Sequence, residues 1–307
     1  MKAKRIYKAW IRDWQLYLFM LLPVTYIVLF AYVPMAGLQL AFRKYTPVGG
    51  IWASPWVGLY NLEKFIQSYQ FKRVVSNTLI LSVYGLVCMQ VIPICFALII
   101  NTIEKPRFVK LTQTVVNLPH FISTVVLVGM LMQVFNSRTG LYGIVYESLT
   151  GRYPNDLFGK LGTFRHLYIW STVWQNFGWS SIIYIAALAG VDAQLHEAAQ
   201  IDGASRVQRI WHVDFPHIKP TIMILLIMGI GNIMSVGFEK AYLMQNNLNL
   251  QHSELISTYV YRIGLSGEGR TDFSYATAIG LFNSVINLVL ILGANTLSRK
   301  LSQTSLF

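Results

Sequence analysis

Six long segments of this chain contain no aspartate, glutamate, lysine or arginine, and most of their residues are apolar. They cover residues 15–34, 74–101, 111–135, 167–191, 221–238 and 273–297. An α-helix needs roughly 20 mostly apolar residues to cross the hydrocarbon core of a bilayer. Backbone groups in lipid must be hydrogen-bonded within the protein, and barrel strands would be shorter and alternate in polarity. The chain is therefore predicted to be an all-α integral membrane protein with about six transmembrane helices.

The composition agrees with a membrane protein and bears on its partners. Of 307 residues, 54% are hydrophobic and only 12% are charged, whereas a soluble domain carries about 25% charged residues. The net charge of +12 would suggest nucleic acid in a soluble protein. Here the basic residues flank the apolar segments, so we expect the lipid bilayer as their partner and no nucleic acid. Cys88 and Cys95 lie inside the second apolar segment and carry no disulfide or metal signal.

The distribution of basic residues predicts that both termini are cytoplasmic. A dense basic cluster precedes the first apolar segment, and positive charge near the first helix usually sets the orientation. That segment is long and no clear cleavage site follows it, so we interpret it as a retained helix. The predicted organisation is a cytoplasmic or interfacial segment 1–14, a membrane domain 15–297 and a cytoplasmic tail 298–307. The loop 192–220 is then cytoplasmic.

A polar stretch, EAAQIDGASRVQRIWHVDFPHIKP, interrupts the apolar pattern at residues 197–220. Ala193 to Gln200 has helix-forming composition, and Gly203 stands where a helix end favours a left-handed residue. Ser205 is a suitable N-cap for a second short helix, which Pro216 is expected to end. Pro220 suits the first turn of the next transmembrane helix. We expect two short helices at an angle to each other.

The second of these helices would expose an apolar stripe to the cytoplasm. Val207, Ile210 and Trp211 recur at i, i+3 and i+4, which places them on one helix face. An exposed apolar patch is costly in water unless something covers it. Either the protein's own helix ends cover this patch or a cytoplasmic partner docks on it, and we favour the partner.

The spacing within this loop resembles the EAA loop of permease subunits of ABC importers. That pattern is Glu-Ala-Ala, three residues, Gly, nine residues and Ile-x-Leu-Pro. The chain has the same spacing, with valine and phenylalanine in place of the usual isoleucine and leucine: Glu197-Ala198-Ala199, Gly203 and Val213-Asp214-Phe215-Pro216. The resemblance implies the type I ABC importer permease architecture, with this loop as coupling helices in a cleft of a cytoplasmic ATPase.

Carried over by motif position, the resemblance also implies the residues that contact the ATPase. They are Glu197, Ala198, Ala199 and Gly203. The small residues would permit close approach, Glu197 would meet a basic group, and Gly203 would supply the bend. From the apolar stripe and the motif's end we add three positions to the predicted contact: Ile210, Trp211 and Pro216.

Two further segments resemble the carbohydrate-uptake branch of this bacterial family, and within it the members that handle oligosaccharides or polysaccharides. They are Asn117-Leu118-Pro119 and the stretch from Leu38 to Leu62. The resemblance implies a second homologous permease subunit, two cytoplasmic ATPase subunits and an extracellular or periplasmic solute-binding protein. It also implies that ATP and Mg²⁺ bind to the ATPase and that this chain holds no cofactor.

The substrate path of such a permease needs amide groups and aromatic rings at membrane depth, because a hydroxyl-rich ligand must be hydrogen-bonded there. There are six candidates. The fourth apolar segment offers Trp174, Gln175, Asn176 and Trp179, the fifth offers Asn232, and Glu239 directly follows the fifth. Alternatively, the tryptophans belong to the interfacial aromatic belt. The amides Asn176 and Asn232 have the alternative of bonding between helices.

The sequence carries no complete catalytic or metal-binding motif. His196-Glu197 begins an H-E-x-x-H pattern, but Gln200 occupies the position of the second histidine. There is no G-x-x-x-x-G-K-[ST] loop for ATP phosphates and no G-x-S-x-G elbow. His120 is the one histidine in the apolar segments, and we expect it to form a hydrogen bond between helices.

We therefore predict a permease subunit of an ATP-driven ABC importer for an oligosaccharide, without enzymatic activity of its own. Three alternatives remain. A permease of the same family could serve a non-sugar solute. A secondary transporter is disfavoured because the apolar segments lack the acids that ion-coupled transport usually uses. An intramembrane enzyme is disfavoured because no catalytic pair is evident.

Overall fold

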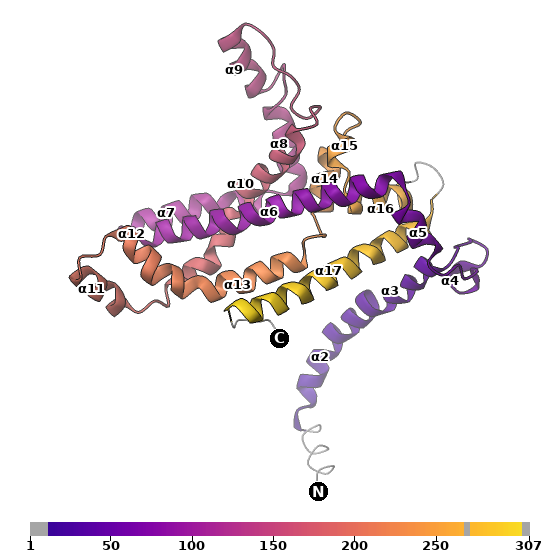
Figure 1. The fold of residues 1–307 in the computed structure, drawn as a ribbon, viewed down its shortest axis with the longest axis horizontal. Helices are drawn as coiled ribbons and strands as arrows, with labels where there is room; N and C mark the ends of the chain where they lie inside the picture. The colour runs from indigo at the N-terminus through magenta and orange to yellow at the C-terminus, as the bar shows by residue number, and fades with distance from the viewer. Residues whose placement is uncertain (1–11, 267–270, 303–307) are drawn as a thin grey trace.

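A computed structural model describes residues 12–266 and 271–302 of the chain. Within these residues the secondary structure is helical, apart from isolated bridges between Arg43 and Trp56 and between Thr46 and Gly50. Long helices run side by side as a bundle, and an N-terminal arm stands apart from it (Figure 1). The predicted all-α class is confirmed. Most of the predicted segment 1–14 lies outside the described residues, as does the end of the tail 298–307.

The N-terminal arm is one continuous helical segment, Trp14–Phe42. It comprises four elements in succession: α2 (Trp14–Ile27), the π-helical η1 (Val28–Tyr32), α3 (Val33–Met35) and the 3₁₀-helical η2 (Ala36–Phe42). The first predicted span, 15–34, therefore lies within a longer helix. Its most apolar stretch is entirely unburied within the chain, which leaves these side chains free to contact lipid or another subunit.

The centre of the bundle is formed by α6 (Tyr69–Asn101) and α10 (Thr163–Leu188), preceded by the short helices α4 (Gly50–Ala53) and α5 (Tyr60–Ile66). Ser68 caps α6 by accepting a hydrogen bond from the Phe71 N–H at 3.2 Å. These helices correspond to the predicted spans 74–101 and 167–191. In the described chain, α10 is not among the helical segments that qualify as spans by length and composition, yet many of its residues are buried.

The third predicted span, 111–135, is not a straight helix. It is divided into α7 (Pro106–Asn117), the 3₁₀ turn η3 (Leu118–Phe121) and α8 (Thr124–Val134), with a 97° bend. Pro119 cannot donate the backbone hydrogen bond that a continuing helix needs. Ser123 then starts a new helix by accepting a hydrogen bond from the Val126 N–H at 3.4 Å. The short helix α9 (Leu141–Thr150) projects beyond α8 (Figure 1).

The fifth predicted span starts earlier than expected. After α11 (Ala193–Ile201), the helical segment Arg206–Gly231 is continuous through α12 (Arg206–Arg209), the π-helical η4 (Ile210–Asp214) and α13 (Phe215–Gly231). The prediction that Pro216 ends a short helix is wrong. Pro216 lacks the N–H that would bond to the His212 carbonyl, and the wider π turn just before it accommodates this loss without breaking the helix. Pro220 lies inside α13 rather than in its first turn.

The chain closes with α14 (Phe238–Met244), α15 (Leu250–Ser253), α16 (Ile256–Gly264) and α17 (Phe273–Ser302). By length and composition, four helical segments of the described chain qualify as membrane spans, and the bent α7–α8 pair raises this to five if it is one span. At one end of α6, α10 and α13, a core cluster joins the three helices through Ala97, Tyr184, Leu188 and Ile218. This cluster supports the loop that follows α10.

Candidate functional site

The loop after α10 contains a helix–bend–helix unit, which we call the α11–α12 element (residues 192–214). It lies at the end of the bundle where α6 finishes, with α11 at its edge (Figure 1). Asp192 caps α11 by accepting a hydrogen bond from the Gln194 N–H at 3.0 Å. The local sequence thus starts the element with a standard N-cap.

Gly203 makes the bend between the two helices, as predicted. Its φ is +78°, in the left-handed region, where a side chain costs roughly 1–2 kcal/mol. The Gly203 N–H bonds to the Gln200 carbonyl at 3.0 Å, and the Ala204 N–H bonds to the Ala199 carbonyl at 2.9 Å. This pair of bonds is the Schellman arrangement that satisfies the last carbonyls of a helix.

Ser205 begins α12, also as predicted. Its Oγ accepts a hydrogen bond from the Gln208 N–H at 3.3 Å, and the Ser205 N–H bonds back to Gln208 Oε1 at 2.7 Å. This reciprocal pair is a capping box. The bend is therefore fixed on both sides, by the left-handed glycine and by the cap.

The outer face of the element is apolar and exposed. The large side chains on it remain uncovered by the rest of the chain: Leu195, Ile201, Val207 and Trp211. Ile201 is 87% exposed, which is unusual for an isoleucine in a well-ordered turn. Ile210, also a predicted contact, is half-buried and packs against the core cluster beneath the element.

The predicted motif residues at 197–199 belong to α11 of the same element. Glu197 and Ala198 are exposed and Ala199 is half-buried. In the part of the chain that the structure describes, the Glu197 carboxylate forms no hydrogen bond or ion pair. Pro216 is exposed in the first turn of α13.

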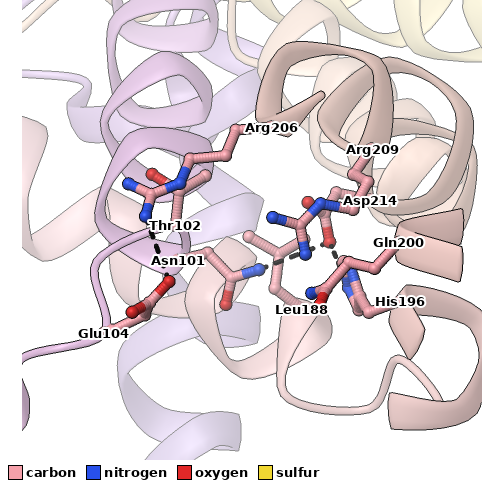
Figure 2. A pocket seen from close by; sticks show the side chains of 9 residues that line it. All are labelled: Asn101, Thr102, Glu104, Leu188, His196, Gln200, Arg206, Arg209 and Asp214. Carbon is pink, nitrogen blue, oxygen red and sulfur yellow. Dashed lines mark hydrogen bonds and ion pairs between the residues drawn. The ribbon is translucent and has the colours of Figure 1, made fainter. Parts of the chain in front are cut away.

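A polar cluster attaches the inner face of the element to the bundle. Asp214 is 2% exposed, and its Oδ1 lies 3.2 Å from His196 Nε2 and accepts a hydrogen bond from Asn101 Nδ2 at 3.3 Å. Figure 2 shows these three side chains converging from α11, η4 and the end of α6. One buried carboxylate thus connects three helical elements.

The same pocket contains two arginines of α12. Its volume is about 290 Å³, and its lining includes Arg206 and Arg209. Arg206 pairs with Glu104 at 3.1 Å (Figure 2), but both side chains are exposed, so this ion pair contributes at most about 1 kcal/mol. The Nε atom of Arg209 is buried without a hydrogen-bond partner in the described chain.

Sequence reasoning did not predict the roles of His196, Asp214 and Asn101. Asp214 was visible only as the variable position of the motif, and His196 only as part of an incomplete zinc pattern. Asn101 is distant from both in the sequence. The single available signal was an acid beside an apolar core segment, because a buried carboxylate requires partners.

Three predicted path residues meet at the break between α7 and α8. Gln175 Nε2 donates to the Ile122 carbonyl at 2.7 Å. Asn176 Oδ1 lies 2.9 Å from His120 Nδ1, and the Trp179 ring stacks on His120 at 4.4 Å with 6° between planes. The expectation that His120 hydrogen-bonds between helices is confirmed. Two amides and one indole ring of α10 therefore contact the break between α7 and α8.

The other three path candidates are not brought to this place. Trp174 lines a separate apolar pocket of about 330 Å³ together with Phe135 and Trp170. Asn232 donates to the Met228 carbonyl of its own helix at 3.0 Å and is exposed. Glu239 is exposed in the first turn of α14. Within the described residues, no group of three or more His, Cys, Asp or Glu side chains has metal-site geometry.

Comparison with known proteins agrees with this geometry. Residues 93–303, more than half of the chain, match the family described as binding-protein-dependent transport system inner membrane component. The chain belongs to this family. The matched region includes the broken α7–α8 helix, the α11–α12 element and α13. The chain is thus a transport subunit rather than an enzyme, and the prediction of a multi-pass membrane permease is confirmed.

Individual relatives cover nearly the whole chain. The polygalacturonan/rhamnogalacturonan transport system permease protein YteP of Bacillus subtilis is 38% identical, over 100% of this chain and 94% of YteP. Protein LplB of the same species is 38% identical, over 96% of this chain and 92% of LplB. In a solved bacterial ABC transporter for the acidic polysaccharide alginate, one chain is 37% identical with a TM-score of 0.89, covering 97% of this chain and 99% of that one. The predicted ABC importer permease architecture is therefore confirmed.

Proposed function

We propose that this ABC importer permease carries an oligosaccharide across the bacterial cell membrane. The proposal rests on relatives matched over almost their full length, among them the permease YteP and the alginate transporter. A further relative at 27% identity, AraP of Bacillus subtilis, is a permease of an arabinooligosaccharide transport system. A carbohydrate substrate also suits a path of amides and aromatic rings.

The α11–α12 element is the proposed docking site for a cytoplasmic ATPase, and its exposed apolar face is the observation that carries this proposal. Leu195, Ile201, Val207 and Trp211 are all exposed at the end of the bundle. A patch of this kind on a compact, doubly capped unit is typical of a protein interface. Glu197 stands beside it as a free carboxylate for a basic group of the ATPase. Two ATPase subunits would hydrolyse ATP with Mg²⁺, one on this chain and one on a second homologous permease subunit.

Movement of the ATPase would reach the membrane helices through the buried polar cluster. His196 in α11 and Asn101 at the end of α6 share the Asp214 carboxylate, and α12 continues without a break into α13. Displacing the element therefore pulls on α6 and α13 together. Such a connection suits alternation between outward- and inward-facing states, in which packed helices move as rigid units.

The proposed substrate path passes the broken helix. Asn176 and Trp179 of α10 face η3 there, next to His120, and Gln175 holds the turn. Irregular backbone at membrane depth is tolerated where protein or a water-filled cavity surrounds it. Trp174, Asn232 and Glu239 are retained as path residues only for conformations in which the helices separate.

A binding protein on the outer side would deliver the substrate. The related alginate transporter was solved with an alginate pentasaccharide-bound periplasmic protein. For this chain we propose the orientation in which both termini and the α11–α12 element are cytoplasmic. Single cysteines at Ser205 and Lys105 should resist an impermeant thiol reagent in intact cells, whereas those at Arg152 and Asn247 should react. Labelling at Ser205 from outside would reverse the orientation.

Uptake by the reconstituted transporter tests the function as a whole. The chain is assembled in proteoliposomes with its neighbouring permease, ATPase and binding protein, and uptake of labelled oligosaccharides is followed with and without ATP. We expect uptake that needs both ATP and the binding protein. Uptake driven by an ion gradient without ATP would indicate a secondary transporter. ATP-dependent uptake of a non-sugar solute alone would indicate the other branch of the family.

A further inference from the structure

A basic pocket lies at the opposite end of the bundle from the α11–α12 element. Its volume is about 660 Å³, and its charged lining consists of Lys72, Arg73 and Arg165, with no acid among the lining residues. Lys72 is in the first turn of α6 and Arg73 directly follows it, and Arg165 is in the first turn of α10. The other ends of these helices, at Asn101 and Leu188, line the pocket of Figure 2. A helix of 33 residues is about 50 Å long, so the two pockets are far enough apart to lie on opposite sides of a hydrocarbon core about 30 Å thick.

The cations of this basic pocket oppose the electrostatics of the helices that carry them. A helix N-terminus carries a partial positive charge and therefore favours acidic side chains. Each exposed acid there stabilises the helix by roughly 0.3–1 kcal/mol. Neither α6 nor α10 has an acid in its first turn. Two helix N-termini and three cations therefore converge, an arrangement that raises the free energy of the empty protein.

Acids of the chain compensate this charge only in part. Glu254 is buried beneath the pocket and forms ion pairs with both Arg73 and Arg262. Lys72 and Arg165 have no acidic partner within the described residues. One carboxylate thus serves two arginines, and the pocket keeps an excess of positive charge that an anion would balance.

Hydrogen bonds hold the side chain of Arg165 in a fixed position at the pocket. Arg165 donates to Asn77 Oδ1 at 2.8 Å, and Asn77 Nδ2 donates to the carbonyls of Gln251 at 2.9 Å and Glu254 at 3.1 Å. The Nε atoms of Arg165 and Arg73 are buried without hydrogen-bond partners. A fixed guanidinium fork is well suited to a carboxylate, which accepts two parallel N–H bonds.

The remaining lining suits a sugar rather than a bare anion. Asn247 and Gln251 supply exposed amide groups at the pocket, and Tyr69 is 85% exposed at its rim. Amides donate to and accept from hydroxyl groups. The volume of this pocket lies within the range for small-ligand sites, about 300–1,000 Å³. Its concave shape therefore suits a small ligand.

We propose that this basic pocket binds carboxylate groups of an acidic oligosaccharide, one that contains uronate residues, on the outer side of the membrane. The inference rests on the proposed function, because it takes the substrate to be a carbohydrate. It adds the charge of that carbohydrate and a place where the permease contacts it before the path at the broken helix.

The test uses the purified transport complex without its binding protein and two matched probes. Trigalacturonate and its methyl ester have the same sugar rings, but only the first is charged. We expect trigalacturonate to bind at least about tenfold more tightly than the ester, since one charge-assisted hydrogen-bonded contact is worth roughly that factor. The preference should diminish at high salt and disappear in Lys72→Met/Arg165→Met.

Two further variants make the result specific. Lys72 is exposed, so Lys72→Met alone should keep the fold and lose part of the preference, and Arg165→Lys should retain part of it. Lys160→Met removes an exposed cation of the α9–α10 loop and should change nothing. Equal binding of both probes to the wild type, or an unchanged preference in the double variant, contradicts the proposal.

The remaining outcomes separate this inference from the function on which it rests. If the double variant binds trigalacturonate normally but loses affinity for the loaded binding protein, the basic pocket is a protein docking site and the proposal is wrong. If the wild-type complex imports neutral oligosaccharides as well as charged ones and shows no charge preference in binding, the inference alone fails. If it imports no saccharide at all, the proposed function fails.

Discussion

The imidazole Nε2 of His196 in α11 lies 3.2 Å from Oδ1 of Asp214, a carboxylate that is 2% exposed. This contact connects α11 to η4, which continues into α13. Asn101 of α6 donates to the same carboxylate oxygen. The angle of the α11–α12 element relative to the bundle therefore depends on a buried polar contact as well as on the core cluster below it.

Removing this contact should destabilise the complex and uncouple it. Asp214→Ala leaves the side chains of His196 and Asn101 without their hydrogen-bond partner, and a buried polar group left unsatisfied costs about 1–3 kcal/mol. We expect a lower melting temperature of the purified complex and weaker stimulation of ATP hydrolysis by loaded binding protein. A double-mutant cycle with His196→Ala should give a coupling energy of about 1 kcal/mol or more. Additive effects would show that the two side chains act independently.

The bend at Gly203 gives a second prediction. The space around an added Cβ is empty, so the cost of a substitution comes from the φ of +78° alone. Gly203→Val should cost roughly 1–2 kcal/mol and misplace α12, with loss of transport and of stimulated ATPase activity. Gly203→Asn is the matched control, because asparagine adopts this conformation more readily, and it should retain most activity. Equal activity of both variants would mean that the bend is not required.

Much of this element could be predicted from the sequence, because its signals are local. Asp192, Gly203 and Ser205 act on backbone groups within a few residues, so composition and spacing indicate them. The six apolar segments likewise located every long helix. Pro216 was misinterpreted because a proline ends a helix only when no wider turn accommodates its missing N–H, and the π turn at Ile210–Asp214 has no clear sequence signal.

The contacts that assemble the candidate sites could not be predicted, because they join residues far apart in the chain. Asn101 meets Asp214, and Arg165 meets Asn77. The 97° bend between α7 and α8 depends on Pro119 and on the α10 side chains that contact the turn. Hydropathy treats such a segment as one continuous run.

The proposed path predicts a separation of transport from assembly. Asn176→Ala and Trp179→Ala remove the hydrogen bond and the stacking partner of His120, and each should reduce oligosaccharide uptake about tenfold, the effect of losing roughly 1.4 kcal/mol. Basal ATPase activity and subunit content should remain. Trp170→Ala, at an exposed ring in a different pocket, is the control. Normal uptake in both α10 variants would assign these residues to helix packing only.

Lys240 in α14 predicts a dependence of stability on pH. It is 6% exposed, donates to Thr172 Oγ1 at 2.7 Å and has no acidic partner in the described structure. Burial lowers the pKa of Lys240 to about 7, below its value in the unfolded chain. Between pH 7 and the unfolded pKa, the unfolded chain binds more protons than the folded one, so stability contributed by this group rises with pH.

Melting temperatures of the wild type and Lys240→Met test this sign. The difference between the two melting temperatures should move in favour of the wild type as the pH is raised from 7 to about 9.5. Folding requires the Lys240 amine to lose its proton, and this loss costs less free energy at higher pH. Lys160→Met, at an exposed lysine, should show no such trend. A difference that stays constant with pH would mean that Lys240 is charged in the folded protein.

The docking of the ATPase on the α11–α12 element is tested most directly by reversing the charge of Glu197. Complexes purified through a tag on this chain are compared for ATPase subunits per permease and for ATP hydrolysis stimulated by loaded binding protein. Glu63→Lys, the same change at an exposed site on α5, is the control. Like charges at an interface cost several kcal/mol, so Glu197→Lys should lose the ATPase subunits or their stimulation while Glu63→Lys keeps both. Wild-type stoichiometry and stimulation in Glu197→Lys would contradict the proposed docking site.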